Sequence, residues 1–138
     1  MMSFHYQKIQ LNINIMIDVY DDVLEEHNAI LVDDAIKQLS WKYDYSSQPN
    51  KPNKHWHILC GHNKTECTDA GFDWAHSLFQ TALNKYKFIE KYDVDTYLRI
   101  YMNAHTHGIE PHFHHDDGDF TMIYYPRLDW KLEYGGGT

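Results

Sequence analysis

The chain has 138 residues, of which 43% are hydrophobic, 15% aromatic and 23% charged, and its net charge is −8. This length and composition indicate one globular domain with a hydrophobic core and exclude an intrinsically disordered chain. The high aromatic content favours a sheet-rich fold, because aromatic side chains suit a pleated, half-buried surface. With 12 basic residues against 20 acidic ones, and no basic run, we expect no nucleic-acid partner.

The number of cysteines and the lengths of the apolar runs indicate where in the cell the protein is expected. Cys60 and Cys67 are too few for a disulfide framework. The first residues carry no secretory signal, and no stretch approaches the ~18 apolar residues of a membrane span. We therefore expect a cytoplasmic protein with no membrane partner. A zinc site is disfavoured, because the two thiols are not spaced as paired zinc ligands are. Its candidate ligands would be His55, His57, Cys60, His62 and Cys67.

Hydrophobic periodicity predicts the elements of the first half of the chain. Residues 4–18 alternate as a half-buried strand or hairpin arm does. An apolar stripe predicts a helix over 27–39, with Asn28 as its N-cap. Short strands are expected at 41–45 and 56–60, separated by a polar loop over 46–54, and a further loop is expected over 61–71.

The second half begins with the clearest helix and continues with strands. Residues 72–89 carry an i, i+3, i+4 stripe that predicts a helix packed on a sheet as a buttress (Ala75, Leu78, Phe79, Ala82, Leu83, Tyr86). Four strands are then expected, at 96–101, 111–117, 119–126 and 131–134, with loops or turns over 103–108, at Gly118 and over 126–130. This element order predicts an α+β fold with a mainly antiparallel sheet.

Histidines are concentrated just before the end of the chain. Five of the 11 lie between His105 and His115. Alternate residues of a strand share a face, so His112, His114 and Asp116 are expected on one side. An imidazole and a carboxylate held in this way are two of the three ligands in the two-His, one-carboxylate facial triad of non-haem Fe(II) oxygenases. The short pattern His-x-Asp is also met by His115 and Asp117, so spacing alone leaves two registers open.

The segments around this pattern carry further motifs. They are Arg99-Ile100-Tyr101, His114-His115-Asp116, Thr121-Met122-Ile123-Tyr124-Tyr125, Trp130 and Gly136-Gly137-Thr138. Together they resemble the prolyl-4-hydroxylase-like branch of the 2-oxoglutarate/Fe(II)-dependent dioxygenases. The resemblance covers residues 95–138. It implies a double-stranded β-helix (jelly-roll, cupin-like) core, incomplete at the C-terminus and buttressed by two N-terminal helices. Residues 1–138 would form a single domain, with 1–94 as the support region and 95–138 as the start of the core.

The resemblance also implies a site. It selects His114 and Asp116 as ligands of Fe(II), with 2-oxoglutarate and O₂ as co-substrates, and it places Tyr101, Thr121 and Tyr125 around the 2-oxoglutarate. The reaction would be hydroxylation of a peptide or a small molecule, coupled to decarboxylation of 2-oxoglutarate to succinate. The substrate itself is left open.

One departure from the family pattern affects the expected activity. The family has a second, distal His and a basic residue, usually Arg, on strands beyond the Gly-Gly-x-Thr motif. This chain ends at Thr138, and Arg127 lies in a connection. We therefore expect the N-terminal part of an enzyme, completed by further residues or by a second chain or copy. The alternatives are a non-catalytic jelly-roll assembly or interaction module, and a His-rich metal-binding protein.

Overall fold

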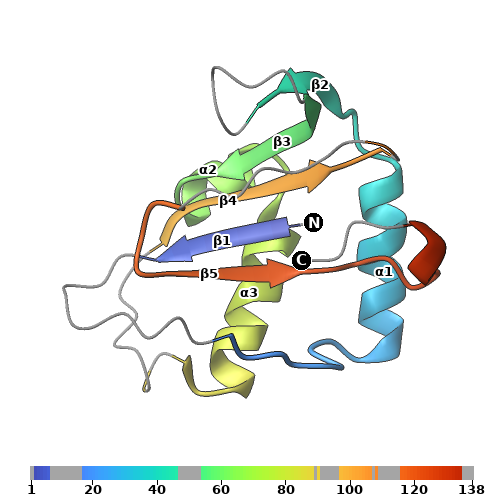
Figure 1. Cartoon of the computed structure of the whole chain (residues 1–138). Helices are drawn as coiled ribbons and strands as arrows, with labels where there is room; N and C mark the ends of the chain where they lie inside the picture. Colours follow the sequence, from blue (N-terminus) through green and yellow to red (C-terminus); the bar gives the residue numbers. More distant parts are fainter. Residues whose placement is uncertain are drawn as a thin grey trace.

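An antiparallel sheet joins segments from both halves of the chain. The computed structural model describes residues 2–6, 17–46, 54–88, 90, 97–106, 108 and 116–134. Within these ranges five strands pair in the order β2-β3-β4-β1-β5. They are β1 (Met2–Tyr6), β2 (Lys42–Tyr45), β3 (His55–Gly61), β4 (Tyr97–Ala104) and β5 (Phe120–Tyr124), and every neighbouring pair is antiparallel. The N-terminal strand therefore lies between two strands from the C-terminal third (Figure 1).

Helices cover one side of this sheet. They are α1 (Glu26–Lys37), α2 (Lys64–Asp69) and α3 (Asp73–Lys85), and a short 3₁₀ helix, η1, spans Leu132–Tyr134. In Figure 1, α2 and α3 lie behind the sheet and α1 stands beside one end of it. None of the helices described here is long and apolar enough to cross a bilayer.

The core forms between α3 and the sheet because both present an apolar face there. Ala75, Leu78, Phe79, Ala82 and Leu83 of α3 are all buried, as the helical spacing predicts. On the sheet side, Ile100 and Met102 of β4 are almost fully buried in the same cluster. Since side chains alternate along a strand, Arg99, Tyr101 and Asn103 of β4 project to the opposite face, away from α3.

A register shift between β1 and β4 changes the side on which Tyr97 lies. His5 pairs with Arg99, but Tyr6 pairs with Tyr97, so one residue of β4 is bulged out. Simple alternation would place Tyr97 on the same face of the sheet as Arg99. Instead its ring is buried in the core, with its hydroxyl 3.2 Å from Nδ1 of His76 and 3.8 Å from Sγ of Cys67.

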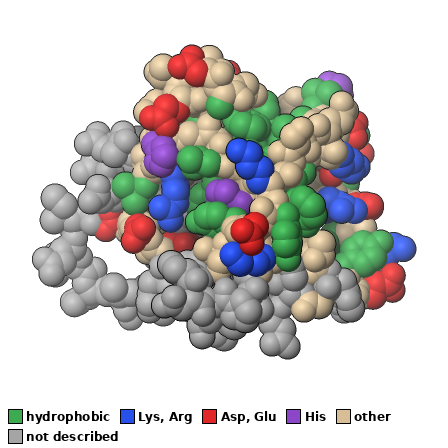
Figure 2. All heavy atoms as spheres, turned by 90° about the horizontal axis from the view of Figure 1, so that it is seen from above, with side chains coloured by type: hydrophobic (Ala, Val, Ile, Leu, Met, Phe, Trp, Pro, Cys, Tyr) green, Lys and Arg blue, Asp and Glu red, His purple; other side chains and the backbone are tan. Residues whose placement is uncertain are grey.

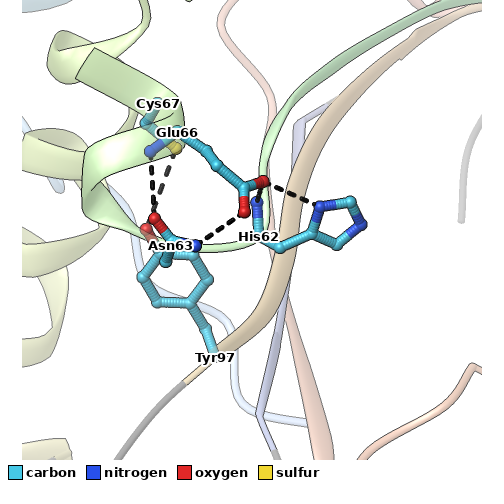
Figure 3. Close-up of polar contacts among 5 residues, drawn as sticks. All are labelled: His62, Asn63, Glu66, Cys67 and Tyr97. Carbon is cyan, nitrogen blue, oxygen red and sulfur yellow. Dashed lines mark hydrogen bonds and ion pairs between the residues drawn. The ribbon is translucent and has the colours of Figure 1, made fainter. Parts of the chain in front are cut away.

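Helix α2 occupies part of the segment predicted to be a loop over 61–71, so that prediction is wrong. Asn63 is its N-cap: the side-chain oxygen accepts a hydrogen bond of 2.9 Å from the Glu66 amide. The Glu66 carboxylate reaches back to the Asn63 side-chain amide (2.7 Å) and the His62 amide (2.9 Å) (Figure 3). This reciprocal capping satisfies amide groups that have no partner within the helix.

Most other predicted elements are present, with different boundaries. The α+β class and the antiparallel sheet are confirmed. The strand predicted over 4–18 is described only as β1, since 7–16 lie outside the described residues, as does most of the strand predicted over 111–117. Three details are wrong. The N-cap of α1 is Glu25, not Asn28; Asn103 belongs to β4, not to a loop; and the last predicted strand, 131–134, contains η1.

Candidate metal and co-substrate site

The predicted site draws on β4, β5 and the turn before β5. Tyr101 is buried in β4, and Thr121 is half-buried in β5. Tyr125 directly follows β5 and is 53% exposed. Asp116 is half-buried immediately before the bend at 117–119. His114, the other predicted metal ligand, lies outside the described residues.

Strand register brings Tyr101 and Thr121 to the same face. On β1, His5 is the register partner of both Arg99 on β4 and Thr121 on β5. Residues that are directly opposite in an antiparallel pair project to the same face, so Arg99 and Thr121 share one. Tyr101, two residues along from Arg99, lies on that face too. We call this the site face; it is the face of the sheet that does not pack on α3.

A side-chain hydrogen bond ties the predicted carboxylate ligand to the site face. The hydroxyl of Thr121 donates to Oδ2 of Asp116 over 3.1 Å. The two residues are five apart in sequence, and the bend at 117–119 turns the chain back so that they meet. Gly118 allows this bend, since its φ of +104° is one that other residues rarely adopt. Carboxylates that bind metals are commonly held by hydrogen bonds of this kind.

A second polar pair on the site face was not expected from the sequence. Nδ1 of His57 on β3 lies 2.7 Å from Oδ1 of Asn103, its register partner on β4. Asn103 is buried, and the His57 ring stacks on Tyr45 at 3.9 Å and 10°. An amide oxygen only accepts, so Nδ1 carries the proton and Nε2 remains an acceptor. The ring is thereby fixed 5.5 Å from that of Tyr101.

Burial keeps this imidazole neutral. Burial lowers the pKa of His57 and is the largest effect. The hydrogen bond to Asn103 raises this pKa, whereas the positive charge of Arg99 lowers it further. Burial likewise lowers the pKa of His105, whose ring stacks on that of His55 at 4.8 Å. Figure 2, seen from above, shows histidine side chains interspersed with basic, acidic and apolar ones at the surface.

Arg99 links the two parts of the site face. Its guanidinium carbon lies 5.5 Å from the centre of the Tyr101 ring, and Nη1 lies 3.6 Å from Oδ2 of Asp117. Asp117 directly follows the predicted ligand Asp116, so the guanidinium is close to the segment that would carry the metal. The sequence motif Arg-x-Tyr contained this residue, but no role followed from it.

Two further findings concern metal ligands. Within the described ranges, no three His, Cys, Asp or Glu side chains are grouped so as to hold a metal ion. Cys60 and Cys67 are free thiols buried in the core. Burial raises the pKa of Cys60 to about 12 and also raises that of Cys67, so both are protonated at neutral pH.

Comparison with protein-family models, with curated proteins and with solved structures found no match to this chain. With no relative to compare, we infer what the site face could bind from its own side chains. Asp116 offers a hard oxygen ligand held by Thr121. His57 offers a fixed neutral acceptor, Tyr101 a phenol and Arg99 a permanent positive charge. This combination suits a small anion bound beside a divalent cation.

Proposed function

We propose that this chain acts as an Fe(II)/2-oxoglutarate-dependent oxygenase that resembles prolyl hydroxylases. His114 and Asp116 would hold the iron, and Tyr101, Thr121 and Tyr125 would line the 2-oxoglutarate site. The observation that carries the proposal is the hydrogen bond from Thr121 to Asp116, 3.1 Å long. It joins two residues that separate motifs assign to one site, on the sheet face that also carries Tyr101.

The proposal also includes an architecture for the core, the double-stranded β-helix. Such a core consists of two facing sheets whose inner side chains line the pocket. The five-stranded antiparallel sheet of this chain, with helices on one face and polar side chains on the other, is compatible with one of those two sheets. The site face would then be the inner face.

The residues present fit a ferrous site in their donor chemistry. A neutral imidazole and a carboxylate are ligand types of non-haem Fe(II) centres. When bound, Fe(II) would supply the oxidative decarboxylation of 2-oxoglutarate that drives hydroxylation of a C–H bond. Thr121 would hold the Asp116 carboxylate in one orientation. The phenol of Tyr101, buried on the same face, would fix the co-substrate by hydrogen bonding.

Metal titration of the full chain tests this proposal. Mn(II), a spectroscopic substitute for Fe(II), would be titrated while the signal of the free ion is followed by electron paramagnetic resonance. We expect binding that is lost in His114→Ala and Asp116→Ala. The matched controls His115→Ala and Asp119→Ala change the same residue types in the same segment and should retain it.

Other outcomes would favour the rival functions. Metal binding that survives Asp116→Ala would indicate a His-rich metal-binding protein instead. A stable oligomer that binds neither metal nor 2-oxoglutarate would indicate an assembly or interaction module. Either result would contradict the proposed oxygenase.

A further inference from the structure

The two arginines of the chain differ sharply in how firmly they are paired. Both Nε and Nη2 of Arg127 contact Oδ1 of Asp129, at 2.8 and 2.7 Å. Arg99 instead approaches Asp117 at 3.6 Å, beyond ordinary hydrogen-bonding distance, and the Asp117 side chain is 81% exposed. An exposed ion pair of this kind contributes little to stability, because water and salt screen it. Asp117 is therefore a partner that Arg99 can readily exchange.

Arg99 lies where its guanidinium could bind an anion on the site face. Its side chain is 33% exposed, and its guanidinium lies near the Tyr101 ring, with a Cζ-to-centroid distance of 5.5 Å. Through the register of β1, it lies on the same face as Thr121, the residue that holds Asp116. A guanidinium that is partly shielded by an aromatic ring binds anions more strongly than one that is fully in water.

We propose that Arg99 binds a carboxylate group of the 2-oxo acid co-substrate and releases Asp117 when it does so. The planar guanidinium can form two parallel hydrogen bonds to a carboxylate, which a point charge cannot. This assignment rests on the proposed function and adds to it a cationic subsite within the first β-helix strands. It gives the co-substrate a charged partner as well as the hydroxyl groups of Tyr101 and Thr121.

Another role for Arg99 must be distinguished from this one. Arg99 and Asp117 could serve only to fasten the bend at 117–119 to β4. A fastening role predicts that removing either partner has the same effect. A carboxylate-binding role predicts opposite effects, because Asp117 then competes with the ligand for the same guanidinium.

Binding of 2-oxoglutarate to the full chain, measured by isothermal titration calorimetry with and without Mn(II), separates the two roles. We expect Arg99→Ala to weaken binding about tenfold or more, since hydrogen bonds to charged groups are lost. Arg99→Lys should recover part of it. Asp117→Asn should tighten binding about two- to fivefold, the converse of breaking a weak exposed pair. Arg127→Ala, the matched control, should change it less than twofold.

Several results would overturn the assignment. They are no 2-oxoglutarate binding by the wild-type chain, equal binding by wild type and Arg99→Ala, and weakening by Asp117→Asn as large as that by Arg99→Ala. Competition by inorganic phosphate as strong as that by succinate would show a general anion site, which also contradicts recognition of a carboxylate. Circular dichroism of each variant excludes unfolding as the cause.

Failure of this inference and failure of the proposed function give different results. If Arg99 is not the cation, Mn(II) binding still depends on Asp116 while Arg99→Ala leaves 2-oxoglutarate binding unchanged. If the oxygenase proposal is wrong, Mn(II) binding does not depend on Asp116, and the titrations without metal still decide whether Arg99 binds the carboxylate.

Discussion

The hydroxyl of Thr121 donates a hydrogen bond to Oδ2 of Asp116 across the bend that begins β5. Asp116 is half-buried, so a bond to its carboxylate is less exposed to competition from water than a surface pair would be. The bond fixes one oxygen of the carboxylate relative to the sheet. A metal ligand held in this way loses less freedom when the metal binds.

Removal of this bond should weaken metal binding without unfolding the protein. Thr121→Val keeps the shape and the β-branched character of the side chain but removes the hydroxyl. We expect Mn(II) affinity to fall about tenfold, the lower end of the effect of losing such a supporting bond. Thr81→Val removes an exposed hydroxyl that donates to Ser77 O within α3, and should leave the affinity unchanged. Equal affinities in wild type and Thr121→Val would show that the bond does not serve a metal site.

The bond between His57 and Asn103 should stabilise the fold. Asn103 is buried and its oxygen is 2.7 Å from Nδ1 of His57. Asn103→Ala leaves that N–H without its partner, so we expect the free energy of unfolding to fall by about 1–3 kcal/mol. Urea denaturation followed by circular dichroism measures it. Asn84→Ala, on an exposed position of α3, is the control and should cost less than about 0.5 kcal/mol. Equal losses in the two variants would mean that the buried pair contributes nothing.

Acid should destabilise the protein through imidazoles that are partly shielded from water. Burial lowers the pKa values of His57, His76 and His105 from 6.5. Between 6.5 and each lowered value the unfolded chain binds more protons than the folded one, so the free energy of unfolding rises with pH across this window. The stability is therefore fully present above about pH 6.5 and is lost as pH falls through the lowered values.

Denaturation curves at several pH values from about 7.5 to about 5 would measure this dependence, because this range spans the ordinary histidine pKa of about 6.5. We expect His57→Gln to reduce its slope, because one of the three groups is removed. A free energy of unfolding that is constant or rises on acidification would contradict the lowered pKa values of these imidazoles.

The two thiols should be unreactive until the protein unfolds. Cys60 and Cys67 are 1% and 0% exposed, and burial raises the pKa values of both. The thiolate is the reactive form, and both burial and protonation suppress its reaction. We expect almost no colour from a thiol-specific disulfide reagent in native buffer at pH 7.5 and full reaction of both thiols in denaturant. Rapid reaction of either thiol in native buffer would show that α2 opens away from β3.

The sequence predicted elements whose signal is local. The apolar stripe of α3 identified a helix whose five predicted residues from Ala75 to Leu83 are all buried. The short helix α2 was missed, although Asn63 followed three residues later by Glu66 is a recognisable capping pattern. Its six residues are too few to show a clear periodicity.

Strand order and register depend on residues far apart in the sequence, so local sequence patterns could not predict them. The insertion of β1 between β4 and β5 joins residues about a hundred positions apart, as in the pairing of Met2 with Met102. The contact of His57 with Asn103 depends on that sheet order and on the β3–β4 register. The bulge that turns Tyr97 into the core arises from a register shift that strand alternation cannot anticipate. Tyr101 and Thr121 were linked by the motif, and the strand register places them on the same face of the sheet; their role at a co-substrate site remains a prediction.

Anaerobic absorption spectroscopy tests the central claim most directly. A 2-oxo acid that chelates Fe(II) gives a charge-transfer band in the visible region. We expect this band when Fe(II) and 2-oxoglutarate are added to the full chain. It should be absent in His114→Ala and Asp116→Ala and retained in His115→Ala. A wild-type chain that forms no band, or a band of equal strength in Asp116→Ala, would contradict the assignment of this segment to an Fe(II)/2-oxoglutarate oxygenase.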